Sequence, residues 1–139
     1  MDLAMLIDRL KNLVGSESSE SARQLDGELL ILHHGIENAE VVALQDGDAE
    51  NEPAEILVLR RDVQPDGVVL VRYFEPPPYT ASLYWAEQFV KAIPAVTNWS
   101  VRCSPVSAIA WVRTENGQPA GHHESSAVAL LMAACLARA

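Results

Sequence analysis

Residues 76–78 are three consecutive prolines, and they constrain the fold of this chain more than any other feature. Proline has no backbone N–H to donate to a sheet ladder, so the β-branched and aromatic segment before them, residues 68–74, has to end as a strand there. Thr80 or Ser82 is then placed to cap a helix, and Pro94 lies just past the end of that helix. The proline run therefore marks the point where a strand becomes a packed helix.

The spacing of apolar residues predicts the other elements. Helical spacing at the N-terminus indicates two short amphipathic helices joined by a polar turn, which together form a helical hairpin. Two pairs of alternating segments indicate antiparallel hairpins, one of them across the strong turn signal at residues 64–67. The last helix is apolar nearly all round, which places it in the core or in a subunit interface. The expected helices are 3–14, 19–33, one between residues 80 and 94, and 124–138; the expected strands are 40–44, 55–61, 68–74, 98–103 and 107–113.

This order of elements predicts an α+β protein, because no regular βαβ alternation appears. We expect an α/β sandwich on a mainly antiparallel sheet of four or five strands, with an N-terminal helical hairpin and an apolar C-terminal helix. A chain of 139 residues is long enough to bury a core without disulfides or metals, and it fits a single domain over residues 1–139.

The charge balance disfavours some classes of partner. Ten basic and nineteen acidic residues give a formal net charge of -9, which repels duplex nucleic acid and anionic membrane surfaces. Much of the acidity lies in residues 46–55, whose glycine and glutamate positions do not fit a calcium-binding loop, so we expect a solvated loop there. No signal peptide or membrane span is visible, so we expect a cytoplasmic protein with no membrane partner.

Three segments point to a known family. The opening helix is followed by Leu25-Asp26 near the start of a second helix, residues 77–83 are Pro-Pro-Tyr-Thr-Ala-Ser-Leu, and residues 126–137 form an Ala/Leu-rich helix. Together they resemble the phage ABA sandwich domain family, small proteins encoded by bacteriophages and prophages. Where members carry Asp-Ala-Ala, this chain has Tyr84-Trp85-Ala86. The resemblance implies an α/β sandwich of phage-related origin, in the host cytoplasm, and it brings no catalytic residues.

Two adjacent histidine pairs are weak candidates for a metal site. They are His33-His34 and His122-His123. Adjacent residues on a helix point about 100° apart, so one pair rarely supplies two ligands to one ion. Each pair also lies beside a glycine at an expected helix boundary, where histidine commonly interacts with helix ends or solvent. We therefore expect no metal and no cofactor.

The two cysteines, Cys103 and Cys135, do not make a disulfide framework or a zinc motif. Both are expected to be small buried apolar residues, with Cys103 on the core side of its strand beside Trp99. Trp99 is in turn expected to meet Trp111 across the sheet and to anchor its packing.

Five arginines lie on expected strands: Arg60, Arg61, Arg72, Arg102 and Arg113. The simplest interpretation is a solvated sheet face whose arginines form salt bridges to the acidic loop, since isolated surface charges seldom have a function. The alternative is an anion pocket, because guanidinium groups that converge on a sheet suit phosphate or carboxylate recognition.

Aromatic residues cluster around the prolines, and most of them should pack the sheet against the following helix. Tyr84 and Trp85 are adjacent on that helix and cannot face the same way, so at least one should point outward. Together with Tyr79 they are candidate partner contacts, since tyrosine and tryptophan are enriched in protein interfaces.

These features predict a phage- or prophage-derived accessory protein that acts by binding, without catalysis. Its partner would be another protein or a second copy, in a homo-oligomer. The alternative is a protein that sequesters a small anionic, nucleotide-like ligand on its strand arginines. A third hypothesis is a small histidine-dependent hydrolase, for which the sequence offers no nucleophile and base in a recognisable arrangement.

Overall fold

The computed structural model describes residues 2–14, 20–44 and 55–138. The sequence also predicts that Gly15 ends the first helix and that a residue of Ser16–Ser21 caps the second. Gly15, the cap candidates as far as residue 19 and the acidic loop as far as residue 54 lie outside the described residues. The chain divides into two compact units, of which unit 1 consists of Met1–Ser18 and Pro78–Ala139, and unit 2 of Ser19–Pro77. The division falls inside the proline run, and a single domain over residues 1–139 stays a prediction.

Within the described ranges the chain forms four helices and six strands. In chain order they are α1 (Leu3–Lys11), α2 (Glu20–His34), β1 (Ala39–Leu44), β2 (Glu55–Val63), β3 (Val69–Phe74), α3 (Leu83–Lys91), β4 (Val96–Cys103), β5 (Ala108–Thr114), β6 (Ala120–His123) and α4 (Ser126–Arg138). The predicted α+β class is therefore confirmed.

The predicted sheet of four or five strands is wrong. The described strands form two separate antiparallel sheets of three strands, with the orders β1-β2-β3 and β4-β5-β6. Each strand pairs only with its neighbours along the chain, and the prolines and α3 separate the two sets. β6 was missed because Ala-Gly-His-His lacks the β-branched residues and the alternation that mark a strand.

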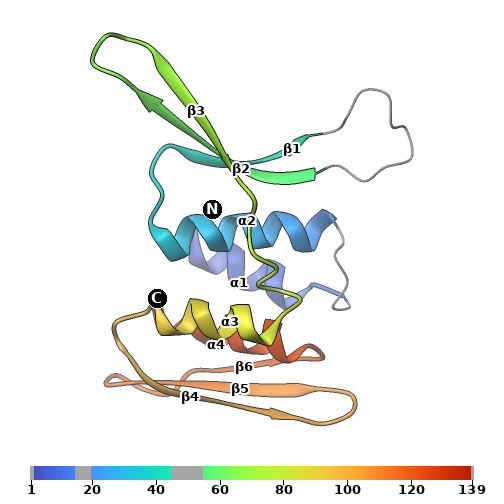
Figure 1. Cartoon of the computed structure of the whole chain (residues 1–139). Helices are drawn as coiled ribbons and strands as arrows, with labels where there is room; N and C mark the ends of the chain where they lie inside the picture. The colour runs from blue at the N-terminus through green and yellow to red at the C-terminus, as the bar shows by residue number, and fades with distance from the viewer. Residues whose placement is uncertain (1, 15–19, 45–54, 139) are drawn as a thin grey trace. The chain divides into compact units, whose positions relative to one another are not determined.

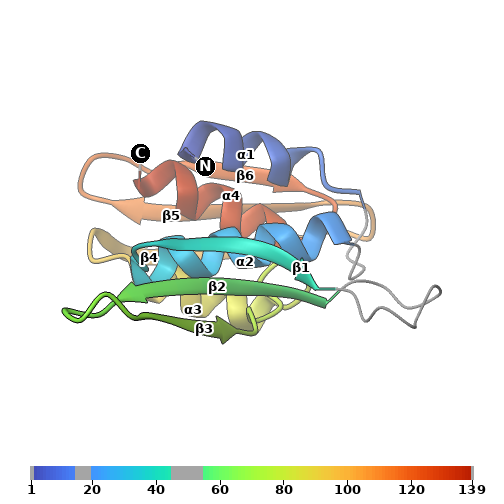
Figure 2. The same cartoon turned by 90° about the horizontal axis from the view of Figure 1, so that it is seen from above.

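In unit 2, α2 packs on one face of the β1-β2-β3 sheet (Figures 1 and 2). The close approach depends on Gly27 in α2, where an added Cβ would lie 2.8 Å from a Cγ of Val41 in β1. Because alternate residues of a strand point to opposite faces, Val41 and its register partner Val58 identify the face that α2 covers.

The β2–β3 hairpin projects past the end of β1. β1 pairs with β2 only as far as Arg60, whereas β3 follows β2 to Val63. Residues 61–63 and 69–71 therefore form a two-stranded ribbon, visible in Figure 1. The turn predicted at residues 64–67 is confirmed: the Gln64 N–H donates to the Val68 carbonyl at 2.8 Å, and Gly67 has a left-handed φ of 86°.

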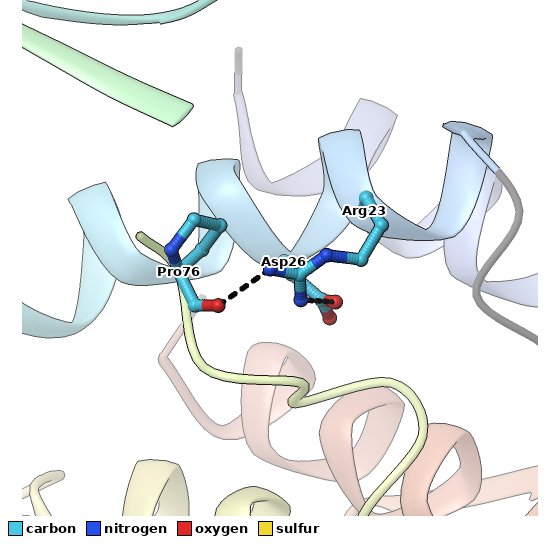
Figure 3. A network of polar contacts seen from close by, with 3 residues as sticks. All are labelled: Arg23, Asp26 and Pro76. Carbon is cyan, nitrogen blue, oxygen red and sulfur yellow. Dashed lines mark hydrogen bonds and ion pairs between the residues drawn. The ribbon is translucent and has the colours of Figure 1, made fainter. Parts of the chain in front are cut away.

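The start of the proline run is fixed to α2 by Arg23 (Figure 3). One guanidinium nitrogen donates to the Pro76 carbonyl oxygen at 2.7 Å, and the other pairs with an Asp26 carboxylate oxygen, also at 2.7 Å. Asp26 is buried, and the ion pair supplies a compensating charge. A proline carbonyl still accepts hydrogen bonds, so this contact holds the end of β3 where its own ladder has stopped.

Unit 1 has α4 at its centre, as expected from its apolar sequence. Residues 127–135 of α4 are all buried, and the helix packs on α1, α3 and the β4-β5-β6 sheet. Gly121 in β6 permits this packing, since a Cβ there would lie 2.1 Å from the Ala129 carbonyl oxygen. α1 belongs to unit 1 and α2 to unit 2, so the N-terminal helical hairpin stays a prediction.

The strand-to-helix transition after the prolines is built as predicted. Ser82 caps α3, with its hydroxyl accepting a hydrogen bond from the Trp85 N–H at 3.4 Å. Tyr79 is buried and packs edge-on against Phe89, with ring centroids 5.9 Å apart. The aromatic cluster therefore fastens this segment to α3.

Candidate binding surfaces

Within the described residues of unit 2, one face of the sheet is apolar and carries no helix of that unit. Because register partners in an antiparallel sheet share a face, the side opposite Val41 and Val58 can be identified from the pairing. Its apolar members are Val42, Leu44, Leu57, Leu59, Val63, Val69, Val71 and Tyr73. This set is called the open face of unit 2, and it lies in front of α2 in Figure 2.

Much of this face is exposed. Val63 is 73% exposed, Tyr73 54% and Val71 48%, whereas Leu59 in the central strand is buried. One ion pair lies on the same face, between Arg61 and Glu40 at 2.7 Å, with both side chains about half exposed. An exposed ion pair of this kind contributes little to stability. The open face is therefore an apolar patch with one positive charge, Arg61, and two negative charges, Glu40 and Glu55.

The strand arginines are divided between the two sheets. Arg60 and Arg72 are register partners on the α2 side of unit 2, and Arg60 pairs with Asp62 at 3.0 Å. Arg102 and Arg113 belong to β4 and β5 of unit 1. Among the described residues, Arg60 pairs with Asp62 of its own strand and Arg61 with Glu40 of β1.

A pocket of about 780 Å³ lies in unit 2 near the end of α2. Arg60 and His34 line it together with two acidic residues, Glu37 and Glu75, and with Tyr73. The two acids offset the two basic groups, and Arg60 already binds Asp62. This pocket consequently gives no concentrated positive charge for an anion.

The aromatic corner of unit 1 separates into a core residue and two surface residues. Tyr79 is buried, Tyr84 is 63% exposed and Trp85 is 36% exposed. Tyr84 and Trp85 meet edge-on with centroids 5.3 Å apart. The prediction that one of the adjacent pair points outward is confirmed, and the contact role of all three side chains stays a prediction.

The histidine pairs lie in two different settings. His33 and His34 end α2 and stack on each other, with centroids 4.4 Å apart. His122 and His123 lie in β6, not at a helix boundary, so their side chains point to opposite faces. Across the described ranges, no group of three or more His, Cys, Asp and Glu side chains is placed to hold a metal ion.

His123 has a structural role within unit 1. Its Nδ1 accepts a hydrogen bond from the Ser125 N–H at 2.9 Å, so the ring proton is on Nε2. Nε2 then donates to the Leu13 carbonyl oxygen at 2.6 Å. Both ring nitrogens are used, and the imidazole ties the segment after α1 to the start of α4.

Two expectations for the second sheet are wrong. Cys103 is exposed, at the last residue of the edge strand β4. Trp99 pairs with Val112, whereas Trp111 pairs with Ser100, so the two tryptophans lie on opposite faces of the sheet and do not meet. The pairing runs in one register from Cys103–Ala108, beside the turn, to Asn98–Arg113, and residue alternation alone does not reveal this register.

The two thiols should differ sharply in reactivity. Burial raises the pKa of Cys135 to about 12, against a partial lowering by Arg138. We expect an aromatic disulfide reagent to modify Cys103 alone in the native protein and both thiols after denaturation. The raised pKa means that the folded state favours the neutral Cys135 thiol. Its contribution to the free energy of unfolding is therefore complete below the unfolded pKa of 9.0, and it declines as the pH rises from there towards about 12. Rapid native modification of a Cys103→Ser variant would contradict this assignment.

The open face of unit 2 was not recognised in the sequence. Residues 56–59 form a continuous apolar run, which is typical of a strand buried on both faces. A usable signal was the stretch 68–71, Val-Val-Leu-Val, next to a turn. Aliphatic side chains on both sides of a projecting hairpin exceed what one helix can cover.

Comparison with family models, with curated proteins and with solved structures finds no match to this chain. The resemblance to the phage ABA sandwich domain family accordingly stays a prediction. None of the helices in the described ranges is long and apolar enough to cross a membrane.

Proposed function

We propose that this protein acts by binding, and that it self-associates through the open face of unit 2. The observation that supports the proposal is the set of exposed aliphatic side chains and Tyr73 on a sheet face without a covering helix among the described residues. Large contiguous apolar patches on a protein surface commonly mark interaction sites. No chemical step is part of this proposal.

The size of the face sets the expected strength of the contact. With nine residues in β2, at about 3.4 Å per residue and about 4.8 Å between strands, the face measures roughly 30 by 14 Å. The resulting flat area of about 400 Å² is about half of the 800 Å² that each partner contributes to a standard interface. We therefore expect a dimer that dissociates in the micromolar range.

A second copy is the partner that fits the charges on this face. Glu40, Glu55 and Arg61 lie on it, and in a two-fold dimer the arginine of one copy can face a carboxylate of the other. Two such sheets pack face to face at about 10 Å, with interdigitating side chains. The alternative of strand pairing through the β3 edge would leave the apolar face uncovered.

A charge on the open face should dissociate the dimer. Val71→Lys places an ammonium group within the apolar patch, and we expect the dissociation constant to rise at least about tenfold, since an unpaired buried charge is costly. Leu70→Lys is the matched control, because Leu70 is the next residue of β3, 44% exposed, on the opposite side of the sheet. Size-exclusion chromatography with light scattering over a concentration series gives both constants.

The two variants also show which other surface is used if the open face is not the interface. Equal weakening by Val71→Lys and Leu70→Lys would indicate the ribbon or the β3 edge, and no change in either variant would exclude this face. The Tyr84–Trp85 surface of unit 1 is the second proposed contact, for a protein partner, supported by the exposure of both rings. The phage-related origin of the chain is part of the same proposal and rests on the segments that resemble the family.

A further inference from the structure

The sheet of unit 1 also has a face turned away from the helices, and its composition differs from that of unit 2. Ala108, Ala110 and Val112 are buried on the α4 side, where Gly121 meets α4. The alternate residues of β5, Ile109, Trp111 and Arg113, therefore lie on the other face. Their register partners there are Asn98, Ser100 and Arg102 of β4 and Ala120 and His122 of β6.

Trp111 occupies the middle of this face between small residues. Ser100 faces it from β4 and Ala120 from β6, so neither neighbouring side chain is large enough to cover the indole. The Arg102 guanidinium carbon lies 6.0 Å from the centroid of the Trp111 ring. Trp111 and Arg113 also line a small pocket of about 90 Å³. The indole is thus partly buried, with the Arg102 guanidinium over the ring and Arg113 two residues further along β5.

The face is positive in a chain whose formal net charge is -9. Arg102 and Arg113 are exposed, as is His122, and none of the face positions named above is acidic. Among the residues that the structure describes, no carboxylate forms an ion pair with Arg102 or Arg113. These two guanidinium groups are available to an anion, in contrast to Arg60 and Arg61 in unit 2.

We propose that this face of unit 1 binds a small nucleotide, with the base stacked on Trp111 and the phosphate bound by Arg113, two residues further along β5, while Arg102 lies on the other side of the ring and adds positive charge. Base stacking on an aromatic side chain tolerates any base, because every base has a π-face. Guanidinium groups bind phosphate through paired charge-assisted hydrogen bonds. Asn98, Ser100 and Gln118 supply polar groups beside the ring.

The charge distribution selects a mononucleotide or dinucleotide over a long strand. Polymer binding needs a basic groove that follows many phosphates, and its affinity depends on their number. This face has two arginines, and the rest of the chain repels a polyanion. The proposal is independent of self-association, because it uses residues of unit 1 alone.

Calorimetric titration of the full chain with AMP, GMP, CMP and UMP tests the proposal. We expect saturable binding of at least one of them, with its nucleoside and inorganic phosphate each at least about tenfold weaker, because each retains only one half of the contacts. Absence of saturable binding by all four nucleotides would overturn the proposal. Tighter binding of a single-stranded oligonucleotide per nucleotide, with a steep salt dependence, would overturn the small-ligand assignment.

Variants locate the site. Trp111→Leu should weaken the nucleotide at least about fivefold, whereas Trp111→Phe, which keeps an aromatic ring, should retain most of the affinity. Arg113→Gln should weaken the nucleotide about tenfold and leave the nucleoside unchanged, a difference that a folding defect would not produce. Arg72→Gln, an exposed strand arginine of unit 2, is the matched control. Equal affinity in wild type, Trp111→Leu and Arg113→Gln would refute the assignment.

Discussion

Replacing Gly121 by alanine is expected to remove most of the stability of unit 1. The new Cβ would lie 2.1 Å from the Ala129 carbonyl oxygen and 3.0 Å from the Ala133 backbone nitrogen. Both are backbone atoms of α4, so no side-chain rotation relieves the contact, and the helix has to move away from β6. Overpacking a core costs about 1–3 kcal/mol and more where the backbone shifts, so we expect a loss of at least about 3 kcal/mol in the free energy of unfolding.

Urea denaturation followed by circular dichroism measures this loss. Ala120→Val is the control, since it adds volume at the preceding residue of β6, on the face turned away from α4, and should change the free energy of unfolding by less than about 0.5 kcal/mol. A Gly121→Ala variant as stable as wild type would mean that α4 does not approach β6 this closely.

The second large effect is expected in α4 itself. Leu130 is fully buried at the centre of this helix, and Leu130→Ala leaves a cavity among packed neighbours. Large-to-small changes of this kind cost about 2–5 kcal/mol. Leu136→Ala, in the same helix but 39% exposed, should cost less than about 1 kcal/mol, because little packing is lost.

The same denaturation experiment compares the two leucine variants. Both substitutions replace leucine by alanine in one helix, so their helix propensities change equally, and the difference between them reports burial alone. Similar losses for Leu130→Ala and Leu136→Ala would contradict the central position of α4 in unit 1.

Local signals in the sequence were sufficient for most elements. The prolines ended β3, Ser82 capped α3 and the apolar composition of α4 placed it in the core, since each depends on residues close in the chain. The number of sheets was not predictable in the same way. Alternation shows that a segment is a strand, but it does not show which strand pairs with it.

Register explains the errors at the candidate sites. A slip of one residue exchanges the two faces of a strand, so the prediction that Trp99 meets Trp111 was wrong although both strands were correctly identified. The pairing that sets Ser100 opposite Trp111 is also what places Arg102 and Arg113 on the same face as that ring. The five strand arginines were found by their residue type, but their division between two sheets required the structure.

The open face of unit 2 depends on which helix covers which strand. Helix α2 packs on the Val41 and Val58 side of the sheet and leaves Val71 and Tyr73 exposed. The apolar pattern of each strand does not predict which of its two faces the helix covers. Apolar residues on both sides of a strand indicate that both faces of the sheet are buried. Within the described part of unit 2, a helix covers only one of the two faces.

Sedimentation velocity of the unmodified chain, from low to high micromolar concentration, tests the proposed self-association most directly. We predict a sedimentation coefficient that rises from the monomer value to the dimer value across this range, because the apolar face of about 400 Å² supports only a modest affinity. The Val71→Lys variant should form the dimer only at concentrations at least about tenfold higher. A wild-type chain that sediments as a monomer at every concentration would contradict self-association through this face.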